Sequence, residues 1–131
     1  MSTRSLICKS TGYQNEVESK YCHWDGYPSW NGDLLVKHYN TEDGIDTLLE
    51  SNGYLSSLGE TLEKSKFITG EDYMTDFHAD EDRLLESAND YGVEYIYLFK
   101  EDEWYVTCTH LECTDVPYKK FILLSDVLKT L

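Results

Sequence analysis

The segment VEYIYLFKEDEWYVTCTH constrains the fold more than any other part of the sequence. Two runs rich in β-branched and aromatic residues, 93–99 and 104–110, flank the polar turn KEDE. Residues of this kind favour strands, and two such runs joined by a short polar turn are typical of a β-hairpin. We therefore expect an antiparallel pair of strands here, with neighbouring side chains on opposite faces of the sheet.

The rest of the chain predicts further strands and three helices around this hairpin. Hydrophobic periodicity, turn residues and capping residues define them. The expected strands are 5–10, 17–24 and a short one in 119–124, and the expected helices are 31–39, 41–53 and 80–91. Ser125 is expected to cap a final helical turn, and 54–74 is expected to be mostly loop. The fold class is therefore α+β, with an antiparallel sheet of about four to five strands and three helices packed mainly on one face.

The second helix has the clearest boundaries. Thr41 is a suitable N-cap, because its hydroxyl can accept a hydrogen bond from a free backbone N–H of the first turn. Ile45, Leu48 and Leu49 form the apolar stripe, and Gly53 follows as a stop signal. In the first helix, Asp33 suits the positive end of the helix dipole.

Length and composition indicate one domain, residues 1–131, with one core. No run of about 18 apolar residues could cross a membrane. The N-terminus, MSTRSLICKS, has no apolar stretch of the length that a signal peptide needs, so we expect a cytoplasmic protein. Because reducing compartments keep thiols reduced, we expect the four cysteines to be free and mostly buried.

The formal net charge of −14 is large for this length. Acidic residues are densest between 71 and 90, and the expected acidic surface comprises Glu71, Asp72, Asp76, Asp80, Glu81, Asp82 and Glu86. Such a surface argues against direct nucleic-acid binding, which depends on cationic contacts with phosphates. It suits a basic partner, including a nucleic-acid-binding protein. A solvated surface that only keeps the protein soluble is the alternative.

The segment YCHWDGYPSW, residues 21–30, is the strongest candidate site. Trp24, Tyr27 and Trp30 have large apolar surfaces with one polar atom each, which suits them to binding. Burial of Trp24 and Tyr27 in the core is the alternative, and we expect some of the three aromatics to be core, with at least one outside. His23 and Asp25 complete the candidate binding site.

A nucleotide-binding pocket is a second interpretation of the same segment. Its aromatic rings could stack on a base. Arg4, Lys20 or Lys37 could then contact the phosphate. The ligand would be a nucleotide signal that the protein sequesters.

Catalytic and metal-binding signals are weak. Cys22 and His23 are neighbours on an expected strand, so their side chains point to opposite faces and do not form a nucleophile–base pair. The segment CTHLEC brings Cys108, His110 and Cys113 close in sequence, but the usual paired zinc-ligand spacing is missing. No phosphate loop, dinucleotide fingerprint or nucleophile elbow occurs. We expect no catalytic residues, no cofactor and no metal.

The chain resembles a family of small phage and prophage proteins with an N-terminal TRS and a YCHWDGYP signature. Here the two motifs are residues 3–5 and 21–28. The resemblance covers most of the chain but not 61–80. It implies an origin in a phage or mobile element and a place in the bacterial cytoplasm.

The leading hypothesis combines the charge with this resemblance. The protein would bind a host protein, in particular one of antiviral defence, and inhibit it without being an enzyme. An acidic surface within residues 42–90 would make the contact. The nucleotide binder described above is the alternative.

Overall fold

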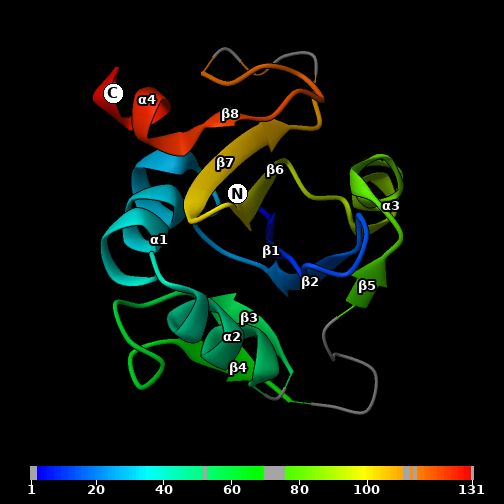
Figure 1. Cartoon of the computed structure of the whole chain (residues 1–131). Helices are drawn as coiled ribbons and strands as arrows, with labels where there is room; N and C mark the ends of the chain where they lie inside the picture. Colours follow the sequence, from blue (N-terminus) through cyan, green and yellow to red (C-terminus); the bar gives the residue numbers. More distant parts are fainter. Residues whose placement is uncertain (1–2, 52, 70–75, 111–112, 114, 131) are drawn as a thin grey trace.

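The computed structural model describes residues 3–51, 53–69, 76–110, 113 and 115–130. They form an α+β fold around one mixed sheet with the strand order β4-β3-β2-β1-β6-β7-β8, and β5 pairs with β2 beside this path (Figure 1). The strands are β1 (Ser5–Ser10), β2 (Val17–Cys22), β3 (Tyr54–Ser57), β4 (Lys66–Ile68), β5 (Asp76–His78), β6 (Tyr95–Lys100), β7 (Glu103–Cys108) and β8 (Ile122–Leu123). The helices are α1 (Asp33–His38), α2 (Glu42–Glu50), α3 (Glu81–Tyr91) and α4 (Leu124–Lys129), and a π-helical turn, η1 (Pro28–Gly32), precedes α1.

The two predicted hairpins are confirmed, but the sheet is not antiparallel throughout. β1 pairs antiparallel with β2, and β6 pairs antiparallel with β7. β1 and β6 lie side by side in parallel, with Ser5 opposite Tyr95 and Lys9 opposite Phe99. Parallel neighbours need a crossover connection, and the chain between β2 and β6 supplies it.

The sheet also has more strands than expected. The segment 54–74, expected to be mostly loop, contains β3 and β4. β2 shares its outer edge between two partners: Cys22 at one end faces Leu55 of β3, while Val17 at the other end faces His78 of β5. Short strands without strong alternation are weak sequence signals, which explains why these were missed.

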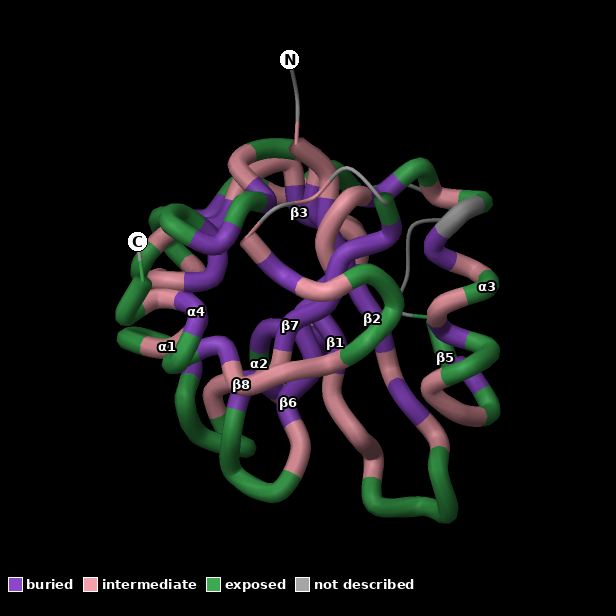
Figure 2. Tube along the Cα trace, turned by 90° about the horizontal axis from the view of Figure 1, so that it is seen from above, coloured by how far each residue is buried: buried purple, intermediate pink, exposed green. Residues whose placement is uncertain are grey.

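Helices cover both faces of the sheet, with most of them on one face, as expected. The larger core lies between one face and η1, α1, α2 and α4. On the opposite face α3 packs alone, and Leu84 and Ala88 meet Leu6, Ile96 and Leu98 of the sheet. Figure 2 shows the buried segments of β1, β2, β6 and β7 between α3 and the pair α1 and α4. The hydrophobic periodicity of 80–91 predicted this helix but not the face of the sheet that it covers.

The predicted N-cap is correct for α2 and wrong for α4. The Thr41 side chain accepts a hydrogen bond from the N–H of Gly44 at 3.1 Å, so the predicted cap of α2 is confirmed. The final helix begins at Leu124 with Leu123 in the capping position, so Ser125 lies inside it and is not the cap. Among the described residues, none of the helices has the length and apolar content to span a bilayer.

Candidate functional site

The sequence motif YCHWDGYPSW forms a rigid loop after β2, which we call the aromatic loop (residues 23–32). β2 ends at Cys22, but the N–H groups of His23 and Trp24 still bond the carbonyls of Leu55 and Ser56 at 2.9 and 3.0 Å. The chain then turns at Asp25, which has a positive φ of 58°. The π-helical turn η1 follows directly and leads into α1.

All three large aromatics of this loop are exposed. Trp24 is 44% exposed, Tyr27 37% and Trp30 49%. The expectation of at least one exposed aromatic is confirmed, but the expectation that some of the three belong to the core is wrong. The core below is instead filled by residues distant in sequence, such as Tyr97, which is fully buried.

Small and polar residues of the loop anchor it to the sheet. The N–H of Gly26 donates to the carbonyl of Thr3 at 2.8 Å, and its own carbonyl accepts from the hydroxyl of Tyr97 at 2.5 Å. A Cβ at Gly26 would lie 2.7 Å from the Thr3 carbonyl oxygen and 2.8 Å from Cβ of Ser5. Only glycine fits this close approach, so the exposed aromatics are held by a buried backbone.

Asn31 is the second anchor and is fully buried. Its amide nitrogen lies 3.3 Å from the carbonyl of Trp24 and 3.4 Å from the sulfur of Cys22. Its side-chain oxygen has no hydrogen-bond partner among the described residues. An unsatisfied buried polar group costs about 1–3 kcal/mol. The unsatisfied oxygen of Asn31, the positive φ of Asp25 and the π-helical turn are three unfavourable local features in one loop. Such features often cluster at functional sites.

His23 and Asp25 contact aromatic neighbours. The hydroxyl of Tyr21 lies 3.0 Å from Nδ1 of His23, and the ring of Trp24 packs edge-on at 4.8 Å. Asp25 accepts a long hydrogen bond from the hydroxyl of Tyr27 at 3.4 Å. Burial raises the pKa of the Cys22 thiol to about 11, so this thiol stays protonated and unreactive.

A second group of aromatics extends from the loop across the α3 side of the sheet, and sequence analysis missed it. The ring of Tyr21 lies 5.5 Å from Tyr54 and 6.5 Å from Tyr91, and the hydroxyl of Tyr91 donates to Asp76. Burial raises the pKa of Tyr21, and the nearby positive charge of Arg4 opposes this shift. Arg4 is therefore the one predicted cation that lies near these rings.

The other two predicted cations lie elsewhere. Lys20 is 2% exposed, and its ammonium donates to the carbonyls of Ser51 and Gly53 at 2.5 and 2.7 Å, in the larger core at the end of α2. Lys37 is exposed on α1 and pairs with Asp33 at 3.0 Å. The alternation of β2 directs Lys20 away from Tyr21, so Lys20 and Lys37 do not join Arg4 beside these rings.

The burial of Lys20 predicts an unusual pH dependence of stability. Burial lowers the pKa of Lys20 from 10.5 to about 8 in the folded protein. Between pH 8 and 10.5, Lys20 binds its proton more tightly in the unfolded chain than in the folded protein. The contribution of Lys20 to the free energy of unfolding therefore increases as the pH rises. We expect the stability difference between the wild type and Lys20→Met to shift in favour of the wild type from pH 8 to 10.

Urea unfolding of both proteins at each pH measures this difference. Titration of other groups cancels in the comparison, including the tyrosines whose raised pKa values act in the opposite direction. Lys37→Met, at an exposed position, serves as the control and should show no such trend. A constant difference across this pH range for Lys20→Met would contradict the prediction.

The described part of the predicted acidic surface lies mostly on α3. Asp82 and Glu86 are exposed, and Glu86 forms an exposed ion pair with Arg83 at 3.3 Å, whereas the less exposed Glu81 pairs with Lys100 at 3.1 Å. Asp80 accepts a hydrogen bond from the N–H of Arg83 at 2.9 Å and so caps the helix. Asp76 receives the hydroxyl of Tyr91. Glu71 and Asp72 lie outside the described residues.

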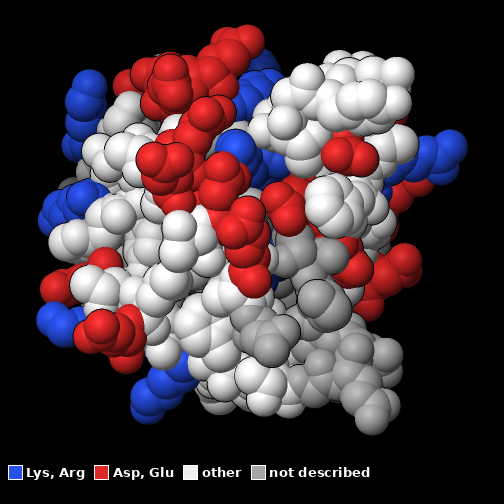
Figure 3. All heavy atoms as spheres, turned by 60° about the horizontal axis from the view of Figure 1, so that its bottom comes forward, with Lys and Arg blue, Asp and Glu red and all other residues white. Residues whose placement is uncertain are grey.

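A further group of acids lies around α2 and β2, mostly within the expected range 42–90 but not among the residues named individually there. Lys9 pairs with Asp46 at 2.8 Å and approaches Glu42 at 4.0 Å. Burial raises the pKa of Glu18, and the charges of Asp46 and Glu50 raise it further, while those of Lys9 and Lys20 oppose this shift. Figure 3 views the protein with the bottom of Figure 1 turned toward the viewer, and carboxylates form a band across this face.

The cysteines do not form a metal site. Cys108 and Cys113 are joined in a disulfide, which corrects the expectation of four free thiols. Cys8 and Cys22 are free and buried, as expected. Within the described ranges, no three histidine, cysteine or acidic side chains are grouped so that they could hold a metal ion.

Comparison with protein-family models, with curated proteins and with solved structures finds no match to this chain.

Proposed function

We propose that the protein is a non-enzymatic binding protein that grips a basic protein partner with its aromatic loop, while its acidic surface attracts that partner. The observation that carries the proposal is the exposure of Trp24, Tyr27 and Trp30 on a loop whose backbone is anchored in the core. Tryptophan and tyrosine are the residues most enriched among binding hot spots. A rigid loop presents them without an ordering cost on binding.

The charge of the chain selects the kind of partner. With a net charge of −14, the protein attracts basic surfaces and repels nucleic acids and acidic proteins. Exposed tryptophan and tyrosine rings also bind arginine and lysine side chains through their π faces. The resemblance to small phage proteins adds that the partner is a host protein, which this contact would inhibit by covering its basic site.

Capture of the partner from bacterial lysate, followed by kinetics with the purified pair, tests this proposal. Replacement of Trp24 and Trp30 by alanine should weaken binding by about 30-fold or more, because each hot-spot residue contributes about 2 kcal/mol or more. The association rate of the wild type should fall steeply as salt rises, since salt screens charge attraction.

Charge reversal tests the acidic surface separately. Asp82→Lys with Glu86→Lys should slow association, while dissociation stays close to that of the wild type. Asp80 and Glu81 are left unchanged because they cap α3 and pair with Lys100, so their loss would also affect folding. If the Trp24 and Trp30 variant binds the partner as the wild type does, the aromatic loop is not the contact and the proposal fails.

The nucleotide interpretation has less support. Of its three proposed phosphate contacts, only Arg4 lies near the aromatic rings, because Lys20 is buried on the other side of β2 and Lys37 is paired on α1. Negative charges at Asp76 and Asp90 act on the neighbouring Tyr91, which disfavours an anionic ligand there.

A further inference from the structure

Arg4 is a part-buried cation that has no acidic partner in the described chain. Its Nε is buried and forms no hydrogen bond. Its two terminal nitrogens, which solvent can reach, form none with the described residues either. A buried polar group without a partner is costly, and more so when it is charged. Acidic residues outnumber basic ones by 25 to 11, so the absence of a carboxylate beside Arg4 is unexpected.

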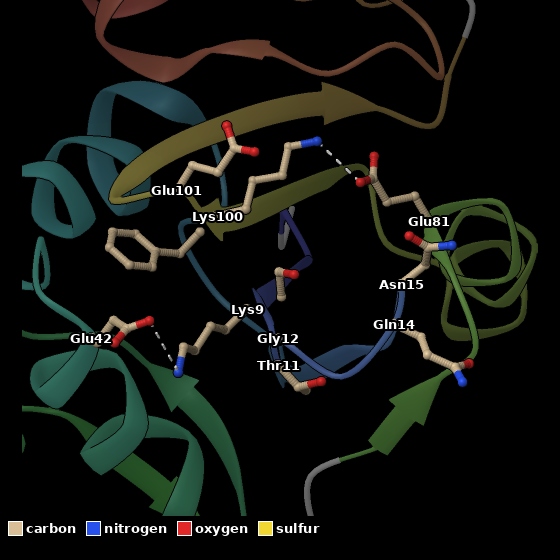
Figure 4. A pocket seen from close by; sticks show the side chains of 11 residues that line it. Lys9, Thr11, Gly12, Gln14, Asn15, Glu42, Glu81, Lys100 and Glu101 are labelled. Atoms are coloured by element: carbon tan, nitrogen blue, oxygen red, sulfur yellow. Dashed lines mark hydrogen bonds and ion pairs between the residues drawn. The ribbon is translucent and has the colours of Figure 1, made fainter.

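The other part-buried cations of the described chain all have partners. Lys9 and Lys100 lie at a crevice of about 430 Å³ at the carboxyl ends of β1 and β6. Figure 4 shows that an acid contacts each of them, Glu42 beside Lys9 and Glu81 beside Lys100. The buried Lys20 donates to two backbone carbonyls. Arg4, at the opposite end of β1, is therefore the exception.

The fold holds Arg4 at the junction of β1, β6 and α3. Its carbonyl accepts hydrogen bonds from the N–H groups of Glu94 and Tyr95 at 2.8 and 3.4 Å, which fixes its backbone beside β6. Its Nη1 lies 3.3 Å from the position that a Cβ of Gly92 would take, just beyond the end of α3. The C-terminal end of a helix carries a partial negative charge that favours a cation. No described carbonyl, however, accepts a hydrogen bond from the Arg4 side chain.

Tyrosine rings lie next to this guanidinium. Tyr21 pairs with Leu6 across β1 and β2, and it is close enough for the charge of Arg4 to act on its hydroxyl. The rings of Tyr54 and Tyr91 lie 5.5 and 6.5 Å from that of Tyr21. All three tyrosines are only part-buried, so each keeps some surface open. A ligand that contacts both features combines a negative group with a flat apolar body.

A carboxylate suits these surroundings better than a phosphate. The terminal nitrogens of a guanidinium can donate two parallel hydrogen bonds to the two oxygens of a carboxylate. Asp76 and Asp90 act on the hydroxyl of Tyr91, so the anionic group belongs at Arg4 and not at that hydroxyl. Their charges also repel a dianion about twice as strongly as a monoanion, which disfavours phosphate.

We propose that Arg4, Tyr21 and Tyr91 bind a small aromatic carboxylate, with its carboxylate on the terminal nitrogens of Arg4 and its ring against the tyrosines. The ligand supplies the negative charge that the described chain does not place beside Arg4. Trp24, Tyr27 and Trp30 are not among its contacts. The inference therefore does not depend on the proposed protein partner.

NMR titration of the labelled protein with benzoate, acetate and benzamide tests this site. The N–H signal of the buried Arg4 Nε reports on the guanidinium directly. We expect benzoate to shift this signal together with the amides of 3–5 and 91–95. Acetate should bind about fivefold more weakly, because it lacks the ring. Benzamide, which has the ring without the charge, should leave these signals unmoved.

Replacement of Arg4 tests the charged contact. Arg4→Gln should weaken benzoate binding about tenfold or more, since it removes the charge-assisted hydrogen bonds. Arg4→Lys keeps the charge without the planar fork and should recover only part of the affinity. Arg83→Gln is the matched control, because it removes one positive charge at an exposed position on α3, and it should leave the affinity unchanged. Unchanged amide signals outside 3–5 and 91–95 show that each variant is folded.

Four results would overturn the proposal. Benzoate could leave the Arg4 Nε signal unmoved, or benzamide could bind as tightly as benzoate. Arg83→Gln could weaken binding as much as Arg4→Gln, which would show a general effect of charge. Inorganic phosphate could bind more tightly than benzoate, which would show that the site does not select a carboxylate.

Discussion

Replacing Trp104 with alanine should lower the free energy of unfolding by about 3–5 kcal/mol, while the same change at Trp24 or Trp30 should cost about 1 kcal/mol or less. Trp104 is 5% exposed and packs edge-on against Phe99 at 5.3 Å. Its Nε1 donates to the carbonyl of Tyr39 at 2.9 Å, which holds the end of α1 against β7. Removal leaves a cavity and a buried carbonyl without its donor.

Urea unfolding of the three alanine variants measures this contrast. It also decides how the binding test above is read, because Trp24 and Trp30 variants must be folded for a loss of binding to mean a lost contact. A loss at Trp30 as large as that at Trp104 would show that Trp30 belongs to the core and would remove it from the proposed contact.

Gly53→Ala should lower the free energy of unfolding by about 2–5 kcal/mol, whereas Gly12→Ala should cost only about 1–2 kcal/mol. Both glycines have a positive φ, +84° at Gly53 and +86° at Gly12, so both substitutions share the same backbone strain. The two positions differ in the room available for the added methyl group. A Cβ at Gly53 would overlap the carbonyl oxygen of Ile68 and approach Cα of Thr69 at 3.0 Å, while a Cβ at Gly12 meets nothing within 4 Å.

The difference between the two alanine variants isolates the cost of pushing β4 away from the end of α2. The same backbone carries the carbonyl of Gly53 that receives the ammonium of Lys20, so displacement there would also loosen the buried lysine. Equal losses of stability at Gly53 and Gly12 would show that only the backbone strain matters and that β4 can move aside without destabilising the protein.

Short-range patterns were sufficient for much of the secondary structure. Alternation between 93 and 110 identified β6 and β7, and the cap at Thr41 identified the start of α2. These signals depend on neighbours within a few residues, so the sequence carries them directly. The motif YCHWDGYPSW could likewise be selected as a candidate site from its composition alone.

What the sequence by itself determined was therefore the α+β class, most of the element positions and the choice of the candidate segment. Only the tertiary structure decided which side chains that segment exposes. Trp24, Tyr27 and Trp30 have the same composition signal as Trp104, yet only Trp104 is buried, because β7 and α1 enclose it. In the same way, the crevice and its paired lysines follow from β1 and β6 lying side by side, 90 residues apart in sequence. Contacts over such separations are set by how whole elements pack, and no local pattern records them.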